Sequence, residues 1–534
     1  MASCNCNRRQ IRVRHHYPTL QGAPMRQSVL SLALITTAIS GLAFQAQAQG
    51  SGLDAIQTVV VIYAENRSFD NLYGSFPGAN GLQNVKPEQA IQVDRDGTPL
   101  KELPPVWDNL TAKGVTPVVT QAQTEHLPNK PFAIDDPNGF NTKLGVVTHD
   151  LWHLFYQNQM QINGGKNDKF VAYADSGALV MGHYDGSKLP LWNVAKQYTL
   201  ADNFFMAAFG GSFLNHQWLI CACTPKYPDA DKTPAKKLIA AVEPDGVSLT
   251  LAANSPKSAM DGIPKFVNNG TITPDFYAVN TMQPPYQPSA NPPAKGGDAR
   301  FADPARPNTL PPQSAQTIGD LLTAKGVSWA WYAGAWQATL DGPRTKPVPN
   351  FQFHHQPFNY FANFAPGTEM RAMHLKDGGM NGVEFIAAID AGKLPQVTFY
   401  KPQGNLNEHA GYADVMSGDQ HIADVIAHLQ KSPQWPHMVV IVTYDENGGF
   451  WDHVAPPKAD RWGPGSRIPA IIVSPFAKKG FVDHTQYDTT SILRLITRRF
   501  QLPELPGLAA RDAALKAHGE PPMGDLTAAL DLPK

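Results

Sequence analysis

Cysteine is scarce in this chain, and its scarcity excludes two kinds of stabilising site. The 534 residues include four cysteines, of which only Cys221 and Cys223 lie beyond residue 48. Two cysteines cannot build a Cys4 zinc site or a disulfide framework. Their Cys-Ala-Cys spacing strains a mutual disulfide, since bridged cysteines need a specific separation and orientation. We therefore expect two small buried side chains without a bridge.

An excess of charge of either sign is also missing. The chain has 44 basic and 45 acidic side chains, for a formal net charge of −1. Proteins that bind nucleic acid present a marked basic excess to the phosphates, so the composition gives no indication of such a partner. Hydrophobic residues make up 42% of the chain, which is ample for a large core.

The first 48 residues have the features of a leader. From Met25 the sequence MRQSVLSLALITTAISGLAFQAQAQG gives a basic residue, an apolar stretch and then Ala46-Gln47-Ala48. This order predicts a secretory signal peptide cleaved after Ala48, and hence a periplasmic or secreted protein. The apolar stretch is short and interrupted by Ser and Thr, which argues against a membrane anchor. Residues 1–24 form an upstream extension, and residues 49–534 are expected to be a single domain.

Near-continuous apolar runs predict strands that are covered on both faces, at 58–66, 327–334, 396–403, 438–449 and 468–476. Helical periodicity appears between them, at 150–162, 315–326, 418–432 and 489–500. This alternation predicts an α/β fold, a three-layer sandwich with a mainly parallel central sheet. The Pro- and Gly-rich segment 284–312 is expected to be a long excursion loop from the same domain.

Two polar pairs follow two of the predicted strands. Glu65 and Asn66 end the first strand, and Asp445 and Glu446 end the strand at 438–449. Ligands bind at the carboxyl ends of strands in such sheets. Adjacent carboxylates repel one another unless a cation or a proton relieves them, and their oxygens suit a divalent metal. Asp445 alone could serve a turn or a helix cap, but two pairs favour a shared site.

Ser212 is the candidate nucleophile. It follows Gly210 and Gly211 in AAFGGSFLNHQWL, where a helix is expected to start and its N–H groups can hold an anion. Asn215 and His216 follow one turn later. The alternative is a plain helix N-cap. The Gly-x-Ser-x-Gly motif of α/β-hydrolases occurs nowhere in the chain.

Several histidines stand in polar, Gly-containing segments: His354 and His355 in FQFHHQPF, and His409 in NLNEHAGYAD. Such groups more often act as acids, phosphate contacts or ligands than a lone histidine does. His149 and His153 are four residues apart and are expected to share a helical face. That pair lacks the Glu of His-Glu-x-x-His, so a metalloprotease is excluded.

Four segments, in this order, carry a resemblance to a known family: ENRSFDNLYG, GGSFLNHQWL, NEHAGYADVMSGDQHIADVI and YDENGGFWDHVAPP. They resemble the bacterial phosphoesterase family of acid phosphatases and phosphatidylcholine-type phospholipases C. INGGKNDKFVAYADSGALVMGHYD is also similar to that family, and the resemblance covers roughly residues 56 to 505. It implies an alkaline-phosphatase-like core and an exported hydrolase of phosphoric ester bonds.

The resemblance also implies roles for individual residues. Ser212 matches the nucleophile that forms a phosphoserine intermediate. A divalent metal, of unknown identity, would be held by Glu65, Asn66, Ser212, Asp445 and Glu446. The active-site histidines would be His153, His354, His355 and His409. Substrate contacts are expected from Asn66, Asn215, His216 and Lys166.

The substrate is expected to be a phosphomonoester or a phospholipid. Phospholipase C members carry Thr-Asn-Pro-Asn-Arg where this chain has Ser-Phe-Leu-Asn-His, which favours the acid phosphatases. A phospholipase C, with transient contact to a membrane surface, is the alternative enzyme. A secreted phosphate- or lipid-binding protein without turnover is the alternative outside enzymes. A sulfatase is disfavoured, because the chain has no Cys-x-Pro-x-Arg or Ser-x-Pro-x-Arg segment.

Overall fold

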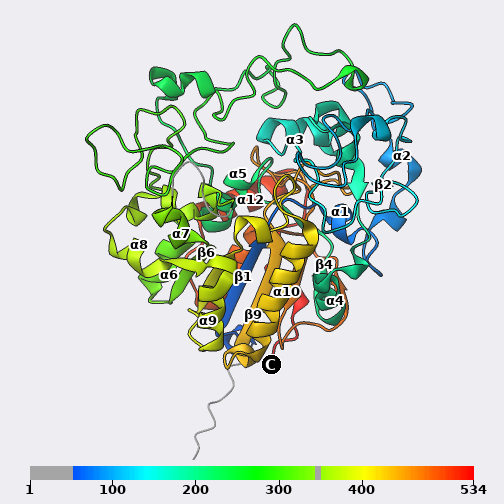
Figure 1. Ribbon diagram of the computed structural model, residues 1–534. Coiled ribbons are helices and arrows are strands. Elements are labelled where there is room, and N and C mark those ends of the chain that lie inside the picture. The colour runs from blue at the N-terminus through cyan, green and yellow to red at the C-terminus, as the bar shows by residue number, and fades with distance from the viewer. Residues whose placement is uncertain (1–51, 343–349, 534) are drawn as a thin grey trace, which may run out of the picture. The chain divides into compact units, whose positions relative to one another are not determined.

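A central eight-stranded sheet organises the chain (Figure 1). The computed structural model describes residues 52–342 and 350–533, so the predicted signal peptide lies outside the described residues. From edge to edge the strands are β11 (Phe481–Asp483), β4 (Thr199–Ala201), β10 (Ala470–Val473), β9 (Met438–Tyr444), β1 (Thr58–Ala64), β8 (Val397–Lys401), β6 (Trp329–Gly334) and β7 (Leu375–Gly379). Within this sheet only β10 runs antiparallel to its neighbours.

Two short two-stranded sheets lie outside the central one. They pair β12 (Tyr487–Asp488) with β5 (Phe204–Phe205), and β2 (Phe132–Ala133) with β3 (Gly182–His183).

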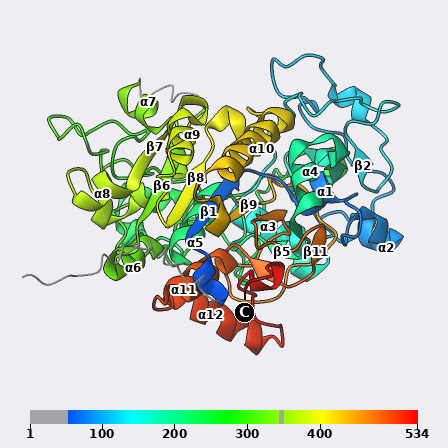
Figure 2. The ribbon, with the colours of Figure 1, turned by 90° about the horizontal axis from the view of Figure 1, so that it is seen from below.

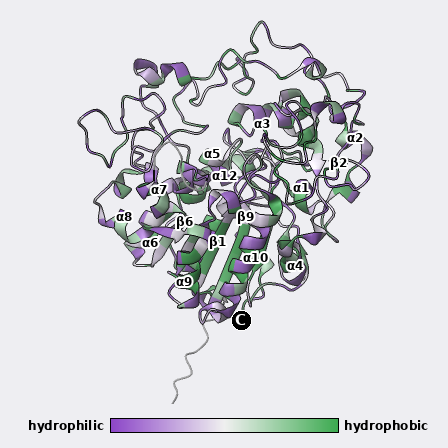
Figure 3. Cartoon of the chain, viewed as in Figure 1, coloured by the Kyte–Doolittle hydropathy of each residue, from purple (hydrophilic) through white to green (hydrophobic). Residues whose placement is uncertain are grey.

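The central strands owe their position to their β-branched runs. Every residue of β1 (TVVVIYA) and β9 (MVVIVTY) is buried. Both strands stand out as hydrophobic in Figure 3, where α10 in front of them also shows polar segments. Strands without a polar face must be covered on both sides, which places them in the middle of a parallel sheet.

Helices cover both faces of the sheet (Figure 2). One face carries α4 (Pro190–Gln197), α9 (Val383–Asp390) and α10 (Val415–Lys431). The other carries α5 (Ser212–Cys221), α6 (Ile318–Lys325), α11 (Thr490–Phe500) and α12 (Pro506–Ala517). The predicted three-layer α/β sandwich with a mainly parallel sheet is therefore confirmed.

The remaining helices lie in the connections, and they are α1 (Phe69–Tyr73), α2 (Pro87–Ala90), α3 (Phe155–Ile162), α7 (Trp336–Asp341) and α8 (Glu369–His374). Between Asp261 and Ile318 the described chain has no helix or named strand, and its loops lie at the top of Figure 1. No helix among residues 52–342 and 350–533 is both long and apolar enough to cross a bilayer.

One predicted helix begins later than its periodicity indicates. The helix expected at 150–162 starts at Phe155, because Leu154 has extended backbone angles (φ −110°, ψ 152°). The segment before it is held by the Asp175 carboxylate, which accepts from the Trp152 N–H at 2.8 Å. His149 and His153 therefore do not share a helical face.

The expectation of two unbridged cysteines is wrong, because Cys221 and Cys223 form a disulfide. Cys221 is the last residue of α5, and Ala222 then adopts the left-handed conformation (φ 47°, ψ 43°). That turn brings the two Cα atoms to 5.1 Å, within the range that a disulfide spans. The sequence gives no sign of a left-handed alanine, so the spacing alone was misleading.

Candidate active site

The two polar pairs meet at the carboxyl ends of β1 and β9. Glu65, Asn66, Asp445 and Glu446 are all fully buried. The Asn66 N–H donates to Asp445 Oδ1 at 3.1 Å, and the Arg67 N–H donates to the Glu446 carbonyl at 3.0 Å. The structure thus brings together the two pairs that the sequence separates by 379 positions.

Ser212 joins this group as the first residue of α5. Its hydroxyl donates to Asn66 Oδ1 at 3.3 Å. Gly211 is the N-cap of the helix, and α5 has no side-chain cap. The Ser212 hydroxyl therefore faces the polar pairs and does not serve as the helix cap.

The loop before Ser212 is fixed by glycine and by Asn215. Gly210 has φ 86°, and a Cβ at that position would lie 2.4 Å from the Phe155 nitrogen. The Asn215 amide oxygen accepts from the Ala208 N–H at 2.9 Å, and its nitrogen donates to the Ala208 carbonyl at 3.1 Å. The Asn215 side chain is thus committed to the loop, where we had expected a substrate contact.

Glu65 is surrounded by basic and hydroxyl groups. Its Oε1 contacts His355 Nε2 and lies 2.8 Å from Lys401 Nζ. Its Oε2 accepts from the Tyr412 hydroxyl at 3.1 Å and lies 3.7 Å from His409 Nε2. Burial by itself raises the pKa of Glu65, but His355 and then Lys401 outweigh it and hold that pKa well below its ordinary value.

His153 lies beside a different carboxylate of the site, that of Glu446. Its Nε2 lies 3.8 Å from Glu446 Oε1, and its Nδ1 is 2.6 Å from the Leu151 carbonyl, to which it donates. Burial alone lowers the pKa of His153, but Glu446, Asp150 and the Leu151 carbonyl together outweigh it and raise that pKa to about 9.

The other histidines form a packed group. The His216 ring stacks on His355 at 5.7 Å and meets His354 edge-on at 5.4 Å. His216 Nδ1 donates to the Ser212 carbonyl at 2.8 Å and lies 3.8 Å from Asp445 Oδ2. Burial lowers the pKa of His216 and of His354 well below the ordinary value, so both rings are neutral.

A cavity of about 280 Å³ opens onto this group. Its lining includes Asp150, His153, Ser212, His354, His409 and Tyr412. The Ser212 residue and three histidines thus line one cavity, which is the arrangement that nucleophilic and acid–base catalysis require. We call it the catalytic cavity.

Two predicted substrate contacts lie elsewhere. Lys166 lines a different cavity, together with His453. His216 is fully buried beneath Ser212 and is not among the residues that line the catalytic cavity.

Several residues of the site were not anticipated from the sequence. Lys401 and Arg67 are fully or almost fully buried, and Arg67 donates through Nε and Nη2 to the Glu408 carbonyl beside His409. Lys401 is the one charged residue of the strand VTFYK, which is a signal that could have been used. Asp150 and Tyr412 offer no such signal, since polar loop residues are common.

The site has the donors and the unmet charge that suit a divalent metal. Asp445 Oδ2, Glu446 Oε1 and His216 Nε2 are buried atoms without a hydrogen-bond partner. Burial raises the pKa of Asp445 to about 6 and that of Glu446 well above its ordinary value. Ligand atoms of Glu65, His216 and Asp445 lie within 4.8 Å of one another, as do those of Glu65, His354 and His355. Oxygen and imidazole donors in this arrangement fit a divalent cation.

The Lys401–Glu65 pair generates a stability prediction. Lys401→Met should lower the free energy of unfolding of the metal-free protein by about 3–5 kcal/mol, because a buried carboxylate loses its cation. Urea denaturation measures the change. The double variant Glu65→Gln/Lys401→Met should recover part of the loss, since it buries no unpaired charge. A single variant as stable as the wild type would contradict the burial argument.

Comparison with known proteins agrees with the family resemblance of the sequence motifs. The model of the Phosphoesterase family matches residues 56–503. Phospholipase C B of Mycobacterium tuberculosis is 24% identical, over 93% of this chain and 85% of that protein. Non-hemolytic phospholipase C of Pseudomonas aeruginosa is 21% identical, over 97% of this chain and 63% of that one. A solved protein in the alkaline phosphatase superfamily from Vibrio parahaemolyticus is 10% identical, over 68% of this chain and 67% of that chain, with a TM-score of 0.27.

Proposed function

The chain belongs to the phosphoesterase family and is a hydrolase of phosphoric ester bonds, and on that premise we propose that Ser212 is its nucleophile. The observation that carries the proposal is the position of the Ser212 hydroxyl, on the wall of the catalytic cavity and 3.3 Å from Asn66 Oδ1. The Ser212 hydroxyl makes no capping hydrogen bond to the start of α5.

The reaction has two displacements at phosphorus. The Ser212 oxygen attacks, a P–O bond to serine forms, and the P–O bond to the leaving group breaks. The serine proton passes to the Asp445 carboxylate, and His153, whose raised pKa keeps its ring protonated, protonates the departing oxygen. Water then attacks phosphorus and gives a proton to His153, while the P–O bond to serine breaks and Asp445 returns its proton to the Ser212 oxygen, which releases the phosphoryl product.

A divalent cation would be held by oxygens of the two strand-end pairs and of the nucleophile, namely Glu65, Asn66, Ser212, Asp445 and Glu446. When bound, it supplies positive charge that lowers the pKa of the serine hydroxyl and neutralises phosphate oxygens. Asn66 is oriented for this by its own N–H bond to Asp445.

The first candidate substrate class is phosphate monoesters. The Ser-Phe-Leu-Asn-His segment and the small catalytic cavity of about 280 Å³ support it. The second candidate is a phospholipase C activity, which is favoured by relatives of that name that align with 93% and 97% of this chain. In both, the bond broken is a phosphoric ester.

Two chromogenic substrates with the same leaving group separate these candidates. We expect the purified protein to hydrolyse p-nitrophenyl phosphate with a higher kcat/KM than p-nitrophenyl phosphorylcholine. The reverse order would favour the phospholipase C. Stoichiometric binding of phosphate without turnover of either substrate would indicate a binding protein.

We also propose that the protein is exported, on the evidence of the basic, apolar and small-residue segments before Gln49. Mass spectrometry of the protein from its native cell should find a chain that begins near residue 49. Retention of residues 30–45 would overturn this proposal.

Substitutions at Ser212 test the nucleophile. Ser212→Ala should fold normally but lose several orders of magnitude in kcat, because nothing else offers a hydroxyl at that position. Ser212→Thr should keep part of the activity, since the hydroxyl survives. Steady-state kinetics, with circular dichroism to check folding, decide the matter. Near-wild-type turnover by a folded Ser212→Ala variant would exclude serine as the nucleophile.

Removal of divalent metal should slow the enzyme, and added divalent ions should restore it. The reason is that buried carboxylate oxygens of Asp445 and Glu446 lack a partner in the protein. Activity before and after dialysis against a chelator, with metal analysis of both samples, measures the effect. Full activity in a sample shown to contain no metal would remove the cation from the mechanism.

A further inference from the structure

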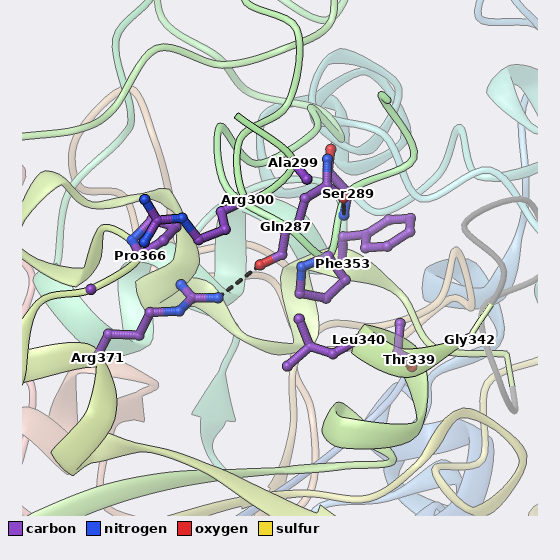
Figure 4. Close-up of a pocket in the computed structure, with 12 residues that line it drawn as sticks. Gln287, Ser289, Ala299, Arg300, Thr339, Leu340, Gly342, Phe353, Pro366 and Arg371 are labelled. Atoms are coloured by element: carbon purple, nitrogen blue, oxygen red, sulfur yellow. Dashed lines mark hydrogen bonds between the residues drawn. The ribbon is translucent and has the colours of Figure 1, made fainter. Parts of the chain in front are cut away.

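A second cavity, of about 640 Å³, shares a wall with the catalytic cavity. Its lining includes Gln287, Arg300, Leu340, Phe353, Pro366 and Arg371, and we call it the Arg371 cavity (Figure 4). Phe353 opens the 3₁₀ turn Phe353–His355. Gln352 and His354, the residues on either side of Phe353, line the catalytic cavity. The two cavities are therefore separate volumes that adjoin at this turn.

The lining of the Arg371 cavity is positively charged. Among the described residues that line this cavity are two guanidinium groups and no carboxylate. Arg300 is paired with Asp298 at 2.7 Å. Arg371 makes no ion pair with any carboxylate of the described chain, and burial lowers the pKa of its guanidinium to about 10. A partly buried cation without a counter-charge is costly, so an anion in this cavity would be favoured.

Arg371 is held in place by neutral acceptors. It donates to the Gln287 carbonyl at 2.7 Å, as Figure 4 shows, and to Asn359 Oδ1 at 2.6 Å and the Phe364 carbonyl at 3.1 Å. Its guanidinium also lies over the Trp336 ring at 5.5 Å. These contacts fix the Arg371 guanidinium beside the cavity, but they do not neutralise its charge. A guanidinium has five N–H donors in all, and these contacts make only three hydrogen bonds.

The rest of the lining favours an apolar body on the ligand. Pro288, Leu340, Phe353 and Pro366 all line the cavity. Binding sites for small molecules combine such surfaces with a few placed polar groups. The volume, more than twice that of the catalytic cavity, suits a ligand larger than inorganic phosphate.

We propose that the Arg371 cavity binds an organic anion with an apolar body, independently of the phosphate ester in the catalytic cavity. The anionic group lies against Arg371, and the apolar body lies against Leu340 and Phe353. The site takes no part in the bond-breaking steps, so it does not depend on the identity of the nucleophile.

Calorimetric titration of the full-length, metal-loaded protein tests the proposal. The probe is benzenesulfonate, and its neutral counterpart is benzenesulfonamide. We expect the sulfonate to bind about tenfold more tightly or better, because only it meets the arginine charge. Saturating inorganic phosphate should leave the Kd of the sulfonate unchanged.

Two variants of matched charge locate the bound sulfonate. Leu340→Glu places a carboxylate on the cavity wall at a partly exposed position and should weaken binding by about tenfold. Met373→Glu adds the same charge at an exposed position of α8 outside the lining and should leave the Kd within about twofold. Arg371→Gln, where it folds, should match Leu340→Glu.

Any of four results would overturn the proposal. They are no binding of benzenesulfonate, equal binding of benzenesulfonamide, competition by inorganic phosphate, and unchanged binding by Leu340→Glu.

Discussion

The parallel pairing of β1 with β9 is the constraint on which the site depends. In its register Ala64 lies opposite Tyr444, and the Asp445 N–H donates to the Ala64 carbonyl at 3.1 Å. The residues after these two positions, Glu65 and Asp445, therefore leave the sheet at the same level. A shift of one strand by one residue would turn its side chains to the opposite face and take the polar pairs out of level. The buried side chains on both faces of β1 and β9 resist such a shift, because it would disrupt their packing.

That register brings the buried carboxyl groups of Glu65, Asp445 and Glu446 close together, and the surrounding residues compensate their charge unequally. Glu65 has Lys401 and His355 against its Oε1, so it stays ionised. Asp445 has no cation in direct contact and Glu446 has only His153, at 3.8 Å, so burial still raises the pKa of each. The imbalance lies on the side of the site nearest Asn66 and the Ser212 hydroxyl. A cation bound there would serve these carboxylates and the proposed nucleophile together.

The parts of this architecture that follow from local pattern could be predicted, and those that follow from packing could not. Apolar runs with polar ends predicted β1 and β9, and the two glycines before Ser212 marked the start of a helix. Lys166 lines another cavity because of the way its loop folds back, and the spacing of residues in the sequence does not predict that path. The Cys221–Cys223 bridge depends on a left-handed Ala222, a conformation that alanine rarely adopts.

The hydroxyl of Ser212 is available because other residues meet the needs of the helix start. Gly211 takes the N-cap position, where serine would otherwise turn its oxygen back to the helix amides. Asn215, one turn later, bonds the Ala208 main chain and holds the glycine loop from within. A helix that lacks a side-chain cap leaves its first N–H groups for an outside acceptor, and phosphate oxygens are suitable ones. The same local arrangement thus frees the proposed nucleophile and leaves anion donors beside it.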